Sequence, residues 1–122
     1  MKFPILLSGV MLFVVGCAAS KSVTTVADDY GYSEKNPIKV GGVNTGPANE
    51  RNYLNKLTGP KGEPVTYHRQ GSCCMFESSK ASFGGMLDIY EVEIEGVTIK
   101  KHLYLNMYDE DKLYAPKGFL MK

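Results

Sequence analysis

The sequence predicts an α+β fold in which one small antiparallel sheet is covered by a single helix. A helical period lies between Gly46-Pro47 and Gly59-Pro60, whereas the residues after Pro64 alternate between apolar and polar, as strands do. The chain has only 122 residues, so it can bury one modest core and form one small domain. These observations together favour a sheet with one helix on its apolar face.

The first two expected elements are an edge strand and the helix. Residues 37–40 alternate and end at Gly41-Gly42, a pattern typical of a short edge strand. A helix is predicted over about 47–58, because Pro47 suits a first turn, where no backbone donor is needed, and Gly59-Pro60 ends it. Its apolar face would carry Tyr53, Leu54 and Leu57.

The remainder of the chain reads as strands. Residues 64–69 alternate, Gly71-Ser72 interrupts the pattern, and residues 73–76 resume it. The Ser- and Gly-rich stretch 78–85 is predicted as a loop. A last short strand is expected within 112–122.

Between these lies a predicted hairpin of residues 86–94 and 97–108, joined at Glu95-Gly96. A tight turn would place Tyr90 opposite Lys101, and His102 opposite Ile89. A bulged turn would instead shift the register by one residue and exchange the two faces.

The N-terminus resembles a bacterial lipoprotein signal peptide. After Lys2, residues 3–15 form an apolar run that would span about 20 Å as a helix, short of the roughly 30 Å hydrocarbon core of a bilayer. The run ends in VVGC, which resembles the lipobox, with Cys17 in the position that receives lipid. The resemblance implies that residues 1–16 are removed and that Cys17 carries acyl chains such as palmitate.

Lipidation would fix the location of the protein. Each buried methylene contributes about 0.8 kcal/mol, so two or three acyl chains hold a protein at a bilayer. Asp directly after the lipidated Cys usually signals inner-membrane retention; here Ala18 follows, which favours the periplasmic face of the outer membrane. Residues 17–29 would then form the lipidated Cys and a flexible tether, and residues 30–122 one domain. An ordinary secreted protein or an uncleaved anchor helix is the alternative.

Composition and length exclude several functional classes. The formal net charge is +1 without a basic block, so nothing points to nucleic acid. A (β/α)8 barrel needs about 250 residues, which excludes large metabolic enzymes. The Gly-rich stretch 41–46 lacks the spacing of a phosphate-binding loop, and the acidic run 109–111 offers too few oxygens for calcium. We therefore expect no cofactor.

Cys73 and Cys74 are the most unusual pair in the predicted domain. The periplasm is oxidising, and once Cys17 is lipidated they have only each other as intramolecular partners. Adjacent Cα atoms lie about 3.8 Å apart, below the roughly 4.4 Å that a disulfide usually needs, and neighbours on a strand point to opposite faces. Two reduced cysteines, a vicinal disulfide, and an intermolecular or reactive thiol all stay open.

The histidines and tyrosines give weaker signals. His68 and His102 suggest two hypotheses, a Cys–His nucleophile pair and a metal site. The spacing matches no compact zinc pattern, so we expect surface histidines and no metal. Tyr104, Asn106 and Tyr108 mix aromatic and polar groups, as binding surfaces do. The alternative is a half-buried strand with its tyrosines at the sheet margin. No convergent acid–base set is visible, so no catalytic residue is predicted.

Five segments of the chain together form a recognisable set of motifs: 31–42 (GYSEKNPIKVGG), 51–55 (RNYLN), 57–60 (LTGP), 71–74 (GSCC) and 103–109 (LYLNMYD). They resemble a family of small bacterial lipoproteins of unassigned function, over nearly the whole predicted domain. The family carries no established activity, so the resemblance implies no catalytic residue. Some members bear the name 2-dehydro-3-deoxyphosphooctonate aldolase, but that enzyme is a barrel of more than twice this length.

The sequence therefore predicts a membrane-anchored bacterial lipoprotein that is not an enzyme and presents a binding or structural surface to another envelope protein. The alternative is a small periplasmic thiol-dependent enzyme or redox protein using Cys73 or Cys74. A ligand-binding module using the tyrosine-rich sheet is a third hypothesis.

Overall fold

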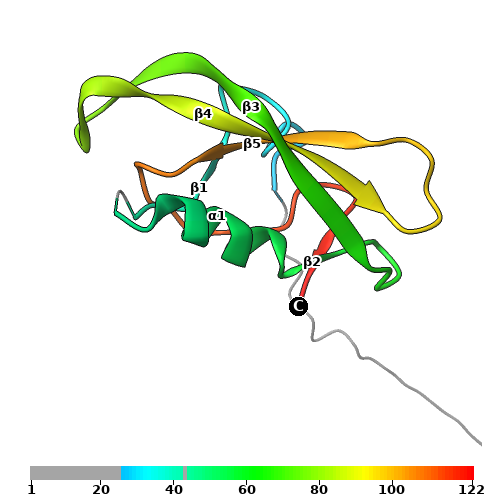
Figure 1. The fold of residues 1–122 in the computed structure, drawn as a ribbon. Coiled ribbons are helices and arrows are strands. Elements are labelled where there is room, and N and C mark those ends of the chain that lie inside the picture. The colour runs from blue at the N-terminus through cyan, green and yellow to red at the C-terminus, as the bar shows by residue number, and fades with distance from the viewer. Residues whose placement is uncertain (1–25, 43) are drawn as a thin grey trace, which may run out of the picture.

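The computed structural model describes residues 26–42 and 44–122, and it has the predicted α+β class (Figure 1). In chain order the elements are β1 (Ile38–Lys39), α1 (Gly46–Leu54), β2 (Leu57–Thr58), β3 (Val65–Ser78), β4 (Ala81–Ile94), β5 (Lys101–Asn106) and β6 (Leu120–Met121). The main sheet has the order β1-β5-β4-β3, and β2 pairs with β6 in a second, two-stranded sheet. The last predicted strand is therefore present as β6, but it pairs with β2 and is not part of the main sheet.

The main sheet is mixed, where the sequence predicted an antiparallel one. β1 lies at an edge, as expected, but runs parallel to β5, with Ile38 opposite Leu105. Parallel neighbours need a long connection that returns the chain in the same direction. Here α1 and the whole β3–β4 hairpin lie between the two strands in the sequence. A local sequence pattern cannot predict pairing between strands that are so far apart in the chain.

Helix α1 begins where the sequence predicts and ends earlier. Pro47 lies in the first turn, and Gly46 before it is packed so closely that an added Cβ would lie 2.6 Å from the Cβ of Met107. The predicted end at residue 58 is wrong, because Leu57–Thr58 pairs with Leu120–Met121 as β2. The partner strand is far away in the sequence, and pairing with it replaces the last predicted turn of the helix.

Strands β3 and β4 form a long hairpin, which corrects two predictions. Residues 71–72 do not interrupt the strand, and residues 78–85 are not a loop; pairing continues through both with three register shifts, and the turn is confined to Ser79 and Lys80. The small residues serve close packing: an added Cβ at Gly85 would lie 2.7 Å from the ring of Tyr108.

The β4–β5 register differs from the predicted one by two residues. Tyr90 lies opposite Leu103, not Lys101, and His102 lies opposite Glu91, not Ile89. The connection is longer than a two-residue turn, because residues 95–100 all lie outside the strands. A shift of two keeps every side chain on its predicted face.

The core lies between α1 and the sheet, where α1 runs beneath β4 (Figure 1). Its fully buried side chains include Ile38, Tyr53, Leu54, Val92, Leu103 and Leu105. The hydroxyl of Tyr53 donates to the carbonyl oxygen of Tyr114 over 2.6 Å, which ties the helix to the C-terminal segment. Ile94 at the open end of the β3–β4 hairpin belongs to this core, whereas Phe83 near the turn is exposed.

The N-terminal predictions lie mostly outside the described residues. Residues 1–25, which hold the predicted signal peptide and Cys17, are not described. Ala27 and Asp29, assigned to the tether, contact the domain: the carbonyl oxygen of Ala27 accepts from the amide of Tyr30, and the Asp29 carboxylate accepts from Asn36. In the described part of the chain, no helix is long and apolar enough to cross a membrane.

Candidate functional site

An ionisable cluster lies between α1 and the sheet. Glu50 of α1 is 1% exposed and Asp88 of β4 is 5% exposed. The Tyr90 hydroxyl donates to Glu50 Oε1 over 3.1 Å. Arg69 of β3 donates to Asp88 Oδ1 through Nε at 3.2 Å and Nη2 at 2.9 Å, and Ser72 Oγ donates to the same oxygen over 3.1 Å. Three elements thus converge on two buried carboxyl groups.

Glu50 holds its proton in this setting. The pKa of Glu50 is raised to about 8, first by burial and then by the hydrogen-bonding contact with Asp88 and the charge of Asp88, against smaller lowering effects of Tyr90 and Arg69. Among the described residues, Glu50 Oε2 is buried with no hydrogen-bond partner in its charged form. A proton makes this carboxyl a donor, so the neutral form resolves the contact between two acidic groups.

A cleft of about 430 Å³ opens over this cluster. Apolar and aromatic side chains form part of its wall, and two arginines stand at its border. The lining residues are Pro47, Glu50, Arg51, Arg69, Ser72, Met86, Asp88, Tyr90, Met107 and Tyr108. The cleft therefore combines an apolar wall with charged groups on three elements, as small-molecule sites do.

The sequence analysis did not foresee that two carboxyl groups, those of Glu50 and Asp88, are buried together beneath a cleft. Glu50 and Asp88 are far apart in the chain and meet only through the packing of α1 on β4. One signal was present in the sequence: Glu50 precedes Tyr53, Leu54 and Leu57 at the spacing of one helix face, so it shares the buried side. A carboxyl group on an apolar face is a candidate for an altered pKa.

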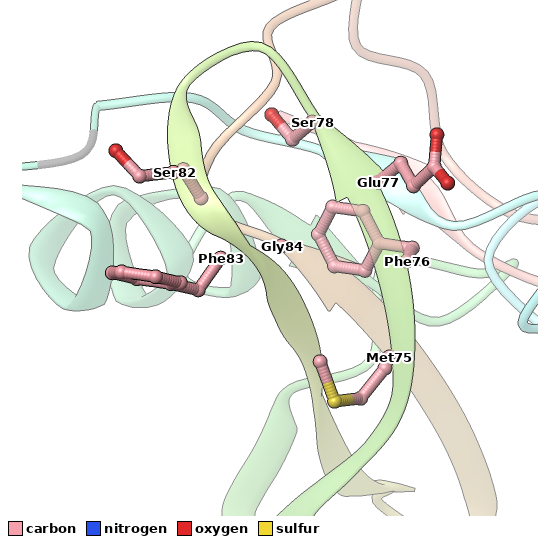
Figure 2. A pocket seen from close by; sticks show the side chains of 8 residues that line it. Met75, Phe76, Glu77, Ser78, Ser82, Phe83 and Gly84 are labelled. Atoms are coloured by element: carbon pink, nitrogen blue, oxygen red, sulfur yellow. The ribbon is translucent and has the colours of Figure 1, made fainter.

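A second hollow, of about 480 Å³, lies at the turn of the β3–β4 hairpin (Figure 2). Phe83 is 93% exposed and points away from the hairpin, and Met75 is 70% exposed. Phe76 packs against Tyr108 with ring centroids 5.8 Å apart. The hairpin end thus exposes apolar side chains to solvent, and the contact between Phe76 and Tyr108 fixes β3 beside them.

The structure joins Cys73 and Cys74 in a vicinal disulfide, one of the alternatives that the sequence left open. Cys74 has a φ of 66°, in the left-handed region, and it has no partner in β4 because the register shifts between Cys73 and Met75. The rule that neighbours face opposite sides applies to extended backbone, and Cys74 departs from it. Glu34 Oε2 lies 3.0 Å from Cys74 Sγ.

The histidines lie on the sheet face away from the core and contact one carboxylate. His68 Nε2 is 3.4 Å from Glu91 Oε1, and His102 Nε2 is 3.6 Å from Glu91 Oε2. Lys100 Nζ lies 3.5 Å from Glu91 Oε1. Both histidine side chains are about half exposed, as the surface hypothesis expects. The described residues contain no group of three side chains placed to hold a metal ion.

The predicted binding residues, which lie in β5 and just after it, divide into two roles. Asn106 is 1% exposed, so it is not part of a surface: its Oδ1 accepts from the backbone amides of Tyr108 and Asp109, and its Nδ2 donates to Asp109 Oδ2. This network holds the turn after β5. Tyr104 and Tyr108 are partly exposed, and Tyr108 lines the cleft over Glu50.

Comparisons with protein families, with curated proteins and with solved structures found no match for this chain. Function therefore rests on the sequence signals and on the geometry of the described residues.

Proposed function

We propose that this chain is a lipid-anchored bacterial envelope lipoprotein, held at the periplasmic face of the outer membrane through acylated Cys17, that binds another envelope protein and has no enzymatic activity. The observation that carries the binding proposal is the exposure of Phe83 and Met75 at the end of the β3–β4 hairpin. Burying such side chains against a partner contributes about 1.5 to 3 kcal/mol each.

The partner proposed for the hairpin end is a protein with an apolar groove, not the bilayer. Glu77 lines the same hollow, on the opposite side of β3 from Phe83 (Figure 2). A carboxylate is costly to place in hydrocarbon, whereas a protein surface can solvate or pair it at the rim of an interface. The described chain begins near the middle of the domain, away from the hairpin turn (Figure 1).

Photo-crosslinking tests the binding surface. A photoreactive residue replaces Phe83 in the full-length protein in cells that make it naturally, and the matched control replaces Thr98, an exposed residue of the β4–β5 turn. We expect one defined protein adduct from position 83 and none from position 98. Equal adducts from both positions, or none from position 83, would contradict the proposed surface.

Mass spectrometry tests the anchor. The mature protein should begin at Cys17 and carry the mass of a diacylglyceryl group and an N-acyl chain, and Cys17→Ser should leave the precursor uncut and without lipid. A free thiol at Cys17 in the natural product would contradict the lipoprotein proposal without bearing on the hairpin surface.

A thiol–disulfide redox protein is the second candidate, favoured by the Cys73–Cys74 bond. In such a reaction a dithiol donor gives up two electrons and two protons, becomes a disulfide, and leaves Cys73 and Cys74 as thiols. Alkylation of the reduced protein across pH separates the candidates. A thiol that reacts rapidly near pH 6 supports redox function, whereas two slow thiols support a structural bond.

A further inference from the structure

The cleft over Glu50 and Asp88 is separate from the hairpin end and is not used by the proposed function. One wall comes from α1, a second from β3 and β4, and a third from Met107 and Tyr108 after β5. Its volume of about 430 Å³ falls within the range of small-molecule sites. The cleft is therefore large enough for a small organic ligand.

The charges around the cleft leave one cation in excess. Asp88 is paired with Arg69, whose side chain is 51% exposed. Arg51 forms no ion pair with any described residue, and its charge lowers the pKa of Tyr90, so it acts on the cleft. With Glu50 protonated, the positive charge of Arg51 has no counter-charge within the cleft.

A buried polar atom marks the floor of the cleft. Glu50 Oε2 is fully buried without a hydrogen-bond partner among the described residues, and a buried polar atom without a partner is unfavourable. The nearby Asp88 Oδ1 already accepts from Arg69 and Ser72.

We propose that this cleft binds a small monocarboxylate with an apolar body, whose carboxylate pairs with Arg51 and whose body packs on Met86 and Met107. Arginine suits a carboxylate because its planar guanidinium donates two parallel hydrogen bonds. A dianionic phosphate fits less well, because the cleft carries one excess positive charge and also contains the Asp88 carboxylate.

Ligand binding is linked to the proton on Glu50. The groups that act on Glu50 are Asp88 and Tyr90 from β4 and Arg69 from β3, and Arg51 of α1 acts on Tyr90 at the same cleft. Loss of the proton places a second negative charge in the cleft and repels a carboxylate. Because the pKa of Glu50 is about 8, affinity should fall about tenfold for each pH unit above that value.

The test is a nuclear magnetic resonance titration of the mature protein with phenylacetate, with neutral phenylacetamide and cationic phenethylamine as matched probes. At pH 7 we expect phenylacetate to shift the amide signals of the cleft residues and to bind at least tenfold more tightly than either matched probe. Raising the pH to about 9 should weaken phenylacetate binding about tenfold.

Three variants separate the roles of the cleft residues. Arg51→Gln should weaken phenylacetate binding at least tenfold, whereas Lys61→Gln, which removes an exposed positive charge elsewhere, should not. Glu50→Gln should abolish the change in affinity between pH 7 and 9. Preferential binding of phenethylamine, equal effects of the two charge-removing variants, or no shifted cleft signals would overturn the proposal.

Discussion

Glu50 should make the domain less stable as the pH rises, and Glu50→Gln should remove this effect. The pKa of Glu50 is about 8 in the folded chain against an ordinary value of 4.5, because the side chain is buried beside Asp88. Between these two values the folded state holds a proton that the unfolded state has released. Unfolding therefore becomes easier with rising pH, by at most about 1.4 kcal/mol per pH unit.

The magnitude follows from that slope. Between about pH 5.5 and 7.5 the contribution of Glu50 should fall by about 2.7 kcal/mol, and above pH 8 it should level off because both states are ionised. The groups that act on Glu50 are Asp88, Tyr90 and Arg69, and all are retained in Glu50→Gln. The difference between wild type and variant thus isolates the one titration.

The assay is urea unfolding of wild type and variant at closely spaced pH values, with both proteins prepared in the same way. The side-chain amide that Glu50→Gln introduces can still donate toward Asp88 and accept from Tyr90, so the fold should persist. We expect the stability of the variant relative to wild type to rise by about 2 to 3 kcal/mol across the window. Parallel stability curves would refute a buried, protonated Glu50.

Three core contacts give further predictions, each measured by urea unfolding at fixed pH. Gly85→Ala should cost about 1 to 3 kcal/mol, because the new methyl would lie 2.7 Å from an aromatic ring, whereas Gly71→Ala, with nothing within 4 Å, is the matched control and should stay within about 0.5 kcal/mol. Leu103→Ala should cost about 2 to 5 kcal/mol because the side chain is fully buried, and Ile99→Ala at an exposed site should change little; equal losses would contradict the assigned core. Tyr53→Phe should cost about 1 kcal/mol by removing a 2.6 Å hydrogen bond to the C-terminal segment, and an unchanged midpoint would argue against that bond.

Features of the fold that depend on neighbouring residues could be predicted from the sequence. The start of α1 at Gly46-Pro47 follows from local backbone chemistry, and β1 follows from a short alternating pattern. The end of α1 could not be predicted, because strand pairing with Leu120–Met121 replaces the last helical turn. Glycine content was also misleading at 78–85, where it permits close packing under a strand and not a loop.

The candidate sites depend even more on tertiary structure. Cys73 and Cys74 stand out in the sequence, but their bond depends on the bulge at Cys74, which a strand pattern does not reveal. The pairing of Glu50 with Asp88 depends on how α1 packs on β4. In the sequence Asn106 resembles a surface residue beside two tyrosines, but its side-chain oxygen accepts hydrogen bonds from two backbone amides of the following turn.

The outer position of β3 has a consequence for this protein at high local concentration. As the last strand of its sheet, β3 leaves one row of amides and carbonyls without a neighbouring strand. Such a border can template the growth of fibres from one molecule to the next. In β3 the register shifts three times, so a straight strand from another copy would fall out of step within a few residues. Irregular pairing of this kind disfavours edge-to-edge polymerisation.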